Sequence, residues 1–265
     1  MSLMTDLLAD LDAESAALDA MVAGLDARQW ATPTPAVGWT VAHQIGHLLW
    51  TDRMAALSAA RPDQFTTAID KVLAGDDVER YVDTAAAAEA ARPQDGVMAD
   101  WRATRAELAE ALAAVPDGVK LPWFGPPMSA ASMVSARLME TWAHGLDVAD
   151  ALGIERADSD RIRAVVHLAV RTRDFAYLVN GLTPPAAPFR YEITAPSGRL
   201  WTWGPDDAPD VVRGPAVDLC ALATQRRNLA DLQLTLIGDE TVRWAGIAQC
   251  FAGPPGGGRP PAAQL

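Results

Sequence analysis

Apolar residues recur at helical spacing through the first 180 or so residues of the chain. Within 3–23, Leu7, Leu11, Leu18 and Val22 follow the three-and-four spacing of an amphipathic helix. Similar patterns, with capping residues before them and glycine or proline after them, predict further helices over 40–60, 96–115, 129–152 and 158–181. The alanine-rich stretch 63–92 predicts a helix that packs weakly or flexes over the mouth of the bundle. We therefore expect a helical bundle.

The periodicity changes after the proline-rich segment 184–188. Residues 189–194 alternate with period two, and Pro196-Ser197-Gly198-Arg199 predicts a hairpin turn into a second strand at 200–203. The remaining patterns predict two strands and two helices, namely strands at 211–213 and 232–237 and helices at 215–228 and 239–251. The expected fold class is α+β. The expected domains are a bundle over 1–183, a small α/β domain over 184–252, and a Pro/Gly-rich tail over 253–265 that is extended or disordered.

Composition narrows the classes of function. The chain has 265 residues, is 50% hydrophobic and carries a net charge of −12, so it can bury a substantial core but repels nucleic acids and anionic membranes as partners. Cys220 and Cys250 lie far apart, which favours neither a disulfide framework nor a thiolate zinc site. The N-terminus lacks a secretion signal and no long apolar run occurs, so we expect a cytoplasmic protein. We expect it to be a monomer or a homodimer.

Candidate chemistry is concentrated on two of the predicted helices. Glu140 and His144 are four residues apart and project from one helix face, while His47 lies on a distant helix. Two imidazoles and a carboxylate can hold a divalent metal, zinc by preference, and leave a coordination position open. Alternatively, a single histidine on an apolar face is a hydrogen-bonded core residue. Glu140 lies among apolar neighbours, where a metal or an arginine would be needed to neutralise it.

These residues carry a family resemblance. The block Trp39-Thr40-x-x-His43-x-x-x-His47-Leu48 and the later block Glu140-Thr-Trp-Ala-His144-Gly-Leu-Asp147 resemble the DinB-like metal-binding four-helix bundles. Within them, the chain is most similar to the mycothiol-dependent maleylpyruvate isomerase group and to an uncharacterised actinobacterial metal-binding subfamily. The resemblance implies a bundle followed by a small α/β domain, with His47, Glu140 and His144 as metal ligands.

Other residues are candidates for the same site. In the isomerase group an arginine of the C-terminal domain meets the substrate carboxylate, and Arg226 or Arg227 falls in the corresponding region; a solvated helix end is the alternative. His43 is a candidate fourth ligand, proton shuttle or donor that orients a ligand. Asp147 either orients a ligand imidazole or makes a local hydrogen bond. His167 matches no motif and is taken as structural.

Several functions fit this ligand set. The resemblance implies an isomerase or S-transferase in which mycothiol, or another low-molecular-weight thiol, binds as thiolate and adds to a small electrophilic organic acid. A metal-acidified water would instead give a hydrolase of an amide or ester. A third alternative is a metal- or ligand-binding protein without turnover. The rigid apolar stretch 121–128 is expected to wall the metal pocket, because it directly precedes the helix of Glu140.

Overall fold

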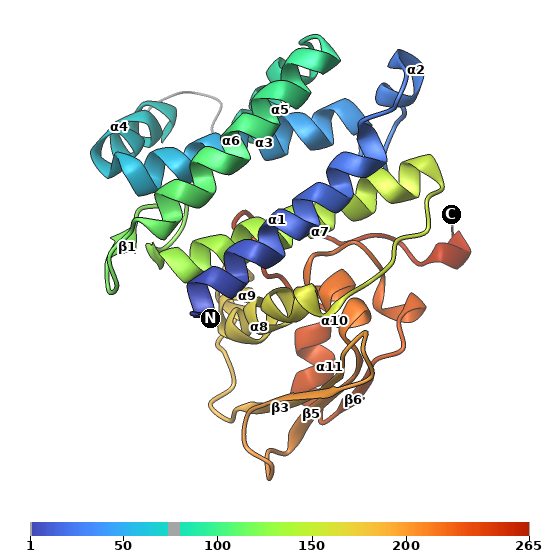
Figure 1. Ribbon diagram of the computed structural model, residues 1–265. Coiled ribbons are helices and arrows are strands. Elements are labelled where there is room, and N and C mark those ends of the chain that lie inside the picture. The colour runs from blue at the N-terminus through green and yellow to red at the C-terminus, as the bar shows by residue number, and fades with distance from the viewer. Residues whose placement is uncertain (1, 74–79, 265) are drawn as a thin grey trace. The chain divides into compact units, whose positions relative to one another are not determined.

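The structure is a computed structural model that describes residues 2–73 and 80–264 (Figure 1). It divides into two compact units, Met1–Arg156 and Ala157–Leu265. The division lies earlier in the chain than the expected boundary at 183/184. Within the described residues, no helix is both long and apolar enough to cross a membrane.

Long helices form the frame of the first unit, as the hydrophobic periodicity predicts. They are α1 (Leu3–Val22), α3 (Val41–Ala60), α6 (Gln94–Ala113) and α7 (Ala130–Leu152). Helix α3 packs on both α6 and α7, and α1 packs on α7. The core between them contains fully buried Ile45, Leu48 and Leu49 of α3 with Trp101 of α6. Helix α3 therefore carries side chains into the centre of the bundle.

Local sequence explains where the two central helices begin and end. Thr40 is the N-cap of α3, and its backbone N–H donates to Nδ1 of His43 at 3.3 Å. Ser129 caps α7 by accepting a hydrogen bond from the backbone N–H of Ser132 at 3.2 Å. Gly153 ends α7 in the left-handed conformation, with φ of 66°. The predicted bounds of these helices are confirmed to within a residue.

The stretch 63–92 departs from its prediction. It forms two helices, α4 (Pro62–Leu73) and α5 (Tyr81–Ala90), and residues 74–79 of the predicted helix lie outside the described residues. Phe65 and Ile69 of α4 are buried against Met54, and Ala86 of α5 is buried against α3. The expected weak packing is therefore wrong for both helices, because α4 packs through large apolar side chains and α5 through the small Ala86, which allows close approach to α3. A short helix that was not predicted, α2 (Ala27–Trp30), begins at a capping box formed by Asp26 and Gln29.

The segment between α6 and α7 forms a short hairpin. Strands β1 (Lys120–Leu121) and β2 (Met128–Ser129) pair antiparallel and enclose a turn that contains Trp123 and Phe124.

The second unit contains a mixed sheet in the order β4-β3-β5-β6. Its strands are β3 (Phe189–Thr194), β4 (Leu200–Trp203), β5 (Asp210–Pro215) and β6 (Thr235–Ile237). Strands β3 and β5 are parallel, while β4 and β6 pair antiparallel with their neighbours. Phe189, Tyr191 and Ile193 are buried on one face of β3, as the period-two pattern predicts.

The second unit also contains the helices that precede the sheet along the chain. The single helix predicted over 158–181 is a 3-10 turn followed by α8 (Arg163–Arg171) and α9 (Arg173–Val179). Thr172 separates the two helices, because its backbone leaves the helical conformation with φ of −94° and ψ of 10°. The hydroxyl of Tyr177 in α9 donates to Glu240 of α11 (Asp239–Ala245). Helix α8 also packs on α10 (Ala216–Ala223), so both helices contact later elements of the second unit.

The last helices are shorter than predicted, and hydrogen bonds join the tail to the rest of the unit. Helix α10 (Ala216–Ala223) and helix α11 (Asp239–Ala245) end before the expected residues 228 and 251. Gln225 follows α10 in a left-handed conformation with φ of 58°, which stops the helix. The tail makes hydrogen bonds to the segment after α10: the side chain of Asn228 donates to the carbonyl of Arg259, and the backbone of Ala262 donates to Asp231. Ala262–Gln264 form a 3-10 turn. An extended or disordered tail stays a prediction.

Candidate metal centre

The structure brings His47, Glu140 and His144 together. Nε2 of His47 lies 3.3 Å from Oε2 of Glu140, and Nε2 of His144 lies 3.1 Å from the same oxygen. The two imidazole centroids are 4.5 Å apart, and one ligand atom of each residue lies within 4.8 Å of the others. We call these residues the candidate triad.

Helix geometry explains this convergence. Glu140 and His144 are one turn apart on α7, so both side chains project from the same face. Helix α3 packs against α7 and presents His47 to that face. The side chains of both histidines are 9% exposed and that of Glu140 is 22% exposed, so the carboxylate is the most accessible member of the candidate triad.

The charge of Glu140 is stabilised by the two imidazoles. Burial alone would raise the pKa of Glu140, but the hydrogen bonds and charges of His144 and His47 outweigh it and hold the pKa well below its ordinary value. The arginine on the same helix, Arg137, pairs instead with Asp52 of α3 at 2.9 Å. The sequence suggested that an arginine or a metal neutralises Glu140. Arg137 already has another partner, which leaves the metal as the candidate.

A hydrogen-bond chain that was not foreseen from the sequence orients His144. Its Nδ1 lies 2.5 Å from Oε1 of the fully buried Gln44 of α3. The Gln44 amide donates to the hydroxyl of Thr34 at 2.8 Å, and that hydroxyl donates to the carbonyl of Trp39 at 3.0 Å. With a metal bound, Nδ1 would keep the proton of His144 and donate it to Gln44, and Nε2 would offer its lone pair to the ion. The sequence feature that could have indicated this chain is Gln44, a polar residue among the buried positions of α3.

A second buried network lies beneath His47. The hydroxyl of Thr51 donates to the carbonyl of His47 at 2.8 Å and accepts from Arg137 at 2.6 Å. Asp52 accepts from Nε of Arg137 and from the indole of Trp101 at 3.2 Å. The network ties α3, α6 and α7 together next to the candidate triad. Nδ1 of His47 is itself buried, without a hydrogen-bond partner among the described residues.

The donor set fits a divalent metal. Two imidazole Nε2 atoms and a carboxylate oxygen point at a common position, with the other nitrogen of His144 already committed to an acceptor. Three such ligands are the protein contribution of catalytic zinc sites, which keep a fourth position for water or substrate. The residues present therefore fit the metal that the sequence predicts.

The other predicted site residues have different surroundings. Nδ1 of His43 lies 2.9 Å from the hydroxyl of Thr40 and its ring lies 6.3 Å from that of Trp39, so His43 helps to cap α3. Burial lowers the pKa of His43, and the Asp83 carboxylate opposes this shift. Asp147 is fully buried one turn beyond His144 on α7. A catalytic role for His43 stays a prediction, as does the orientation of a ligand imidazole by Asp147.

Arg226 and Arg227 lie in the second unit, after α10 and not within its last turn as predicted. The backbone N–H of Arg226 donates to the carbonyl of Ala221 at 2.8 Å, closing the turn around Gln225. Guanidinium groups of both arginines donate to nearby backbone carbonyls, those of Thr224 and of Arg226. Their role toward a substrate carboxylate stays a prediction. In the same unit Nδ1 of His167 accepts from the indole of Trp203 at 3.1 Å, a structural contact.

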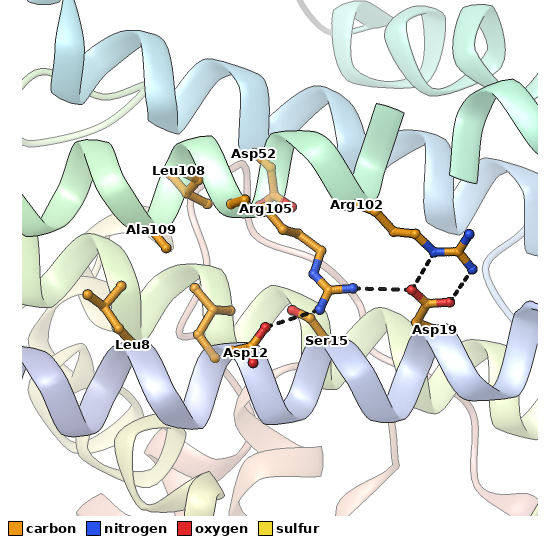
Figure 2. Close-up of a pocket in the computed structure, with 11 residues that line it drawn as sticks. Leu8, Asp12, Ser15, Asp19, Asp52, Arg102, Arg105, Leu108 and Ala109 are labelled. Carbon is orange, nitrogen blue, oxygen red and sulfur yellow. Dashed lines mark hydrogen bonds and ion pairs between the residues drawn. The ribbon is translucent and has the colours of Figure 1, made fainter. Parts of the chain in front are cut away.

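A cavity of about 260 Å³ lies elsewhere in the first unit, between α1 and α6. Figure 2 shows Arg102 and Arg105 of α6 directed at Asp19 of α1, with Asp12 also bonded to Arg105. None of the candidate triad lines this cavity. Its charges are matched within the bundle, so we attribute no chemistry to it.

A family model and two curated relatives match this chain. Residues 11–149 match the family described as the mycothiol maleylpyruvate isomerase N-terminal domain. Two uncharacterized proteins of Mycobacterium tuberculosis, from strains CDC 1551 / Oshkosh and ATCC 25618 / H37Rv, are each 57% identical over 252 residues, covering 95% of this chain and 97% of the relative.

Solved structures show the same fold. The crystal structure of the mycothiol-dependent maleylpyruvate isomerase aligns with a TM-score of 0.60 at 15% identity, and covers 89% of this chain and 93% of that chain. A histidine-to-alanine mutant of that enzyme aligns with a TM-score of 0.59 over the same shares. At this identity the likeness establishes the fold alone.

Proposed function

Because this chain belongs to the family of the mycothiol maleylpyruvate isomerase N-terminal domain, we propose that it is a metal- and thiol-dependent isomerase or S-transferase. The observation that carries the proposal is the convergence of His47, Glu140 and His144 on one position. The relevant substrate class is a small electrophilic organic acid, and the thiol is mycothiol or a similar low-molecular-weight thiol.

The three side chains would hold the metal, zinc by preference. When bound there, zinc would lower the pKa of a thiol or water at the open position and hold the resulting nucleophile. Glu140 contributes a negative charge, which the surrounding imidazoles keep ionised. Gln44 holds the His144 ring so that Nε2 faces the cluster. Burial of both imidazoles at 9% exposure limits the access of bulk water to their nitrogens.

Protons released in the reaction need an acceptor. His43 lies one turn before His47 on α3, and its lowered pKa favours the neutral imidazole that can accept a proton. A carboxylate of the substrate would be met by Arg226 or Arg227, whose guanidinium groups can bind it through paired hydrogen bonds. The proton-accepting role of His43 and the carboxylate-binding role of Arg226 or Arg227 are part of the proposal.

Metal content is the first test. Protein purified without an affinity tag or added metal should carry about one divalent ion per chain, the stoichiometry of a site with three protein ligands. Glu140→Ala and His144→Ala should lose that ion while keeping most of their helicity. The matched control is His167→Ala, which removes a histidine of the second unit and should retain full loading. Full loading in His144→Ala would overturn the ligand assignment.

Thiol dependence then separates the alternative functions. A thiol-dependent enzyme forms product from an electrophilic acid only when the thiol is added, whereas a metal-dependent hydrolase cleaves amide or ester substrates without it. A binding protein without turnover shows affinity for the acid and forms no product with or without thiol. Either of the last two results, in metal-loaded protein, would contradict the proposed chemistry.

A further inference from the structure

A series of aromatic rings begins at the candidate triad and continues outward. Its members belong to the loop before α3, to α3, α4 and α5, and to the turn between β1 and β2. We call them the aromatic wall: Trp39, Trp50, Phe65, Tyr81, Trp123 and Phe124.

The inner end of the wall touches two candidate ligands. The Trp39 ring stacks on His144 with centroids 5.9 Å apart and planes 17° apart, and it lies 5.3 Å from the His47 ring. The Trp39 indole donates to the Asp83 carboxylate of α5 at 3.0 Å, which fixes its orientation. Trp50 follows His47 by one turn of α3, and these rings are 6.0 Å apart.

The outer part of the wall is built around Trp50. Its ring meets Tyr81 edge-on at 5.4 Å and Phe124 at 5.6 Å. The fully buried Phe65 of α4 supports this layer from behind, stacked on Trp123 at 5.7 Å and edge-on to Phe124 at the same distance. Trp50 and Trp123 therefore pack against the buried cluster of Phe65, Met54 and Ile69.

Exposure distinguishes the wall from ordinary core packing. Phe65 is 1% exposed, but Phe124 is 39% exposed, and Trp39, Trp50, Tyr81 and Trp123 are all partly exposed. Aromatic side chains left partly exposed beside a polar cluster are characteristic of ligand sites, where rings pack against a bound group. The wall itself offers neutral surfaces and presents no cation to a carboxylate. A small dicarboxylate would gain little from it.

We propose that the aromatic wall binds a planar, uncharged aromatic group of the substrate and thereby selects aryl-bearing electrophiles over small aliphatic diacids. This inference rests on the proposed function, because it takes the group on the wall to be part of the molecule that reacts at the candidate triad. Trp50 and Phe124 are the specificity-determining residues. Any carboxylate of the same substrate is bound away from the wall.

Calorimetric titration tests the proposal, with 4-nitrobenzyl alcohol as the neutral aromatic probe and maleate as the aliphatic diacid. Wild-type protein should bind the aromatic probe saturably and more tightly than maleate. Trp50→Leu and Phe124→Leu each remove one ring. Each should raise the Kd of the probe by about fivefold, which corresponds to the usual free energy of one aromatic pair. Val82→Ala removes an exposed apolar side chain next to Tyr81 and should leave the Kd unchanged.

The outcomes separate this inference from the proposed function. Titrations are made on metal-stripped protein without thiol and repeated on metal-loaded protein, so ring binding is measured independently of the chemistry. Ring binding by a protein that carries no metal at the candidate triad and shows no thiol-dependent product formation would sustain the wall and overturn the proposed function. An equal Kd in wild type, Trp50→Leu and Phe124→Leu, or no saturable binding by wild type, would overturn the wall. Phe124 lies in an exposed turn, so its variant is informative even if Trp50→Leu fails to fold.

Discussion

Gln44 and His144 are joined across two helices by a hydrogen bond of 2.5 Å between Oε1 and Nδ1. Gln44 is fully buried on α3, three residues before His47, and its amide group is held in turn by Thr34. The bond therefore couples a candidate ligand on α7 to the helix that carries the other candidate histidine. A ligand imidazole that donates its second nitrogen to an acceptor is fixed in tautomer and ring orientation.

Replacing this acceptor should weaken metal binding without removing a ligand. Gln44→Leu, which leaves Nδ1 of His144 without a partner, should lower the affinity for zinc by about 10- to 100-fold, the usual effect of losing such a partner. Gln44→Glu keeps an acceptor oxygen and should bind zinc far better than Gln44→Leu. Competition with a chromophoric chelator measures both affinities. Equal affinities in wild type and Gln44→Leu would show that the bond has no part in metal binding.

Gly46 allows α5 to approach α3 closely. A Cβ at this position would lie 2.9 Å from Cβ of Glu89 and 3.0 Å from the carbonyl oxygen of Ala86. Backbone atoms of α5 are among these contacts, so Gly46→Ala must displace the helix. We expect a loss of about 1–3 kcal/mol in the free energy of unfolding, typical of overpacking, measured by chemical denaturation.

Helix α5 also carries Tyr81 and Asp83, so the same displacement reaches the aromatic wall. Gly46→Ala should therefore weaken binding of the aromatic probe in addition to lowering stability. Gly24→Ala is the matched control, because nothing lies within 4 Å of a Cβ at Gly24. Similar destabilisation by the two substitutions would argue against close packing at Gly46 as the cause.

The Asp19–Arg102 pair of Figure 2 predicts a pH-dependent contribution to stability. Oδ2 and Oδ1 of Asp19 accept from Nε and Nη2 of Arg102 at 2.8 and 2.6 Å, and this pairing lowers the pKa of Asp19. A carboxyl whose pKa is lower in the folded state contributes stability above its unfolded pKa and loses that contribution as the pH falls through the folded pKa.

Asp19→Asn should accordingly destabilise the protein near neutral pH, by about 0.5–1 kcal/mol because Arg102 is half exposed. The difference from wild type should shrink at acid pH, where the wild-type carboxyl is protonated as well. Denaturation curves over a pH series measure both. A difference that grew toward acid pH would contradict the assignment.

The sequence predicted most of the first unit because its helices are amphipathic and clearly capped. Thr40, Ser129 and Gly153 mark ends that the structure confirms. The family resemblance drawn from the two histidine motifs is likewise confirmed by the match over residues 11–149. Helix ends in the second unit were missed where single non-glycine residues leave the helical conformation, as Thr172 does between α8 and α9 and Gln225 does after α10 in a left-handed conformation.

The candidate site was only partly accessible from the sequence. Spacing placed Glu140 and His144 on one face, since four residues make one helical turn. The approach of His47 to these two residues depends on the packing of α3 against α7. The family resemblance, and not the spacing, indicated that His47 joins them. Gln44 and the aromatic wall depend on contacts between residues distant in the chain, such as Trp50 with Phe124, which periodicity does not encode.

The buried pair of Arg137 and Asp52 gives the largest expected effect on stability. Their side chains are 2% and 5% exposed, and Asp52 also accepts from the indole of Trp101. Arg137→Met would leave a buried carboxylate without its counter-charge and should cost about 3–5 kcal/mol of unfolding free energy. Adding Asp52→Asn removes that charge and keeps an acceptor for Trp101, so the double variant should recover at least half of the loss.

Arg102→Met is the matched control for these measurements, because its pair with Asp19 is at the surface and its loss should cost at most about 1 kcal/mol. Neither Arg137 nor Asp52 belongs to the candidate triad, so the folded double variant should retain its metal. A double variant as unstable as Arg137→Met would mean that the lost packing of the long arginine side chain, and not the uncompensated charge, causes the destabilisation. Loss of metal from a stable double variant would instead show that the network holds the helix of His47 in register with α7, through the Thr51 bond to the His47 carbonyl.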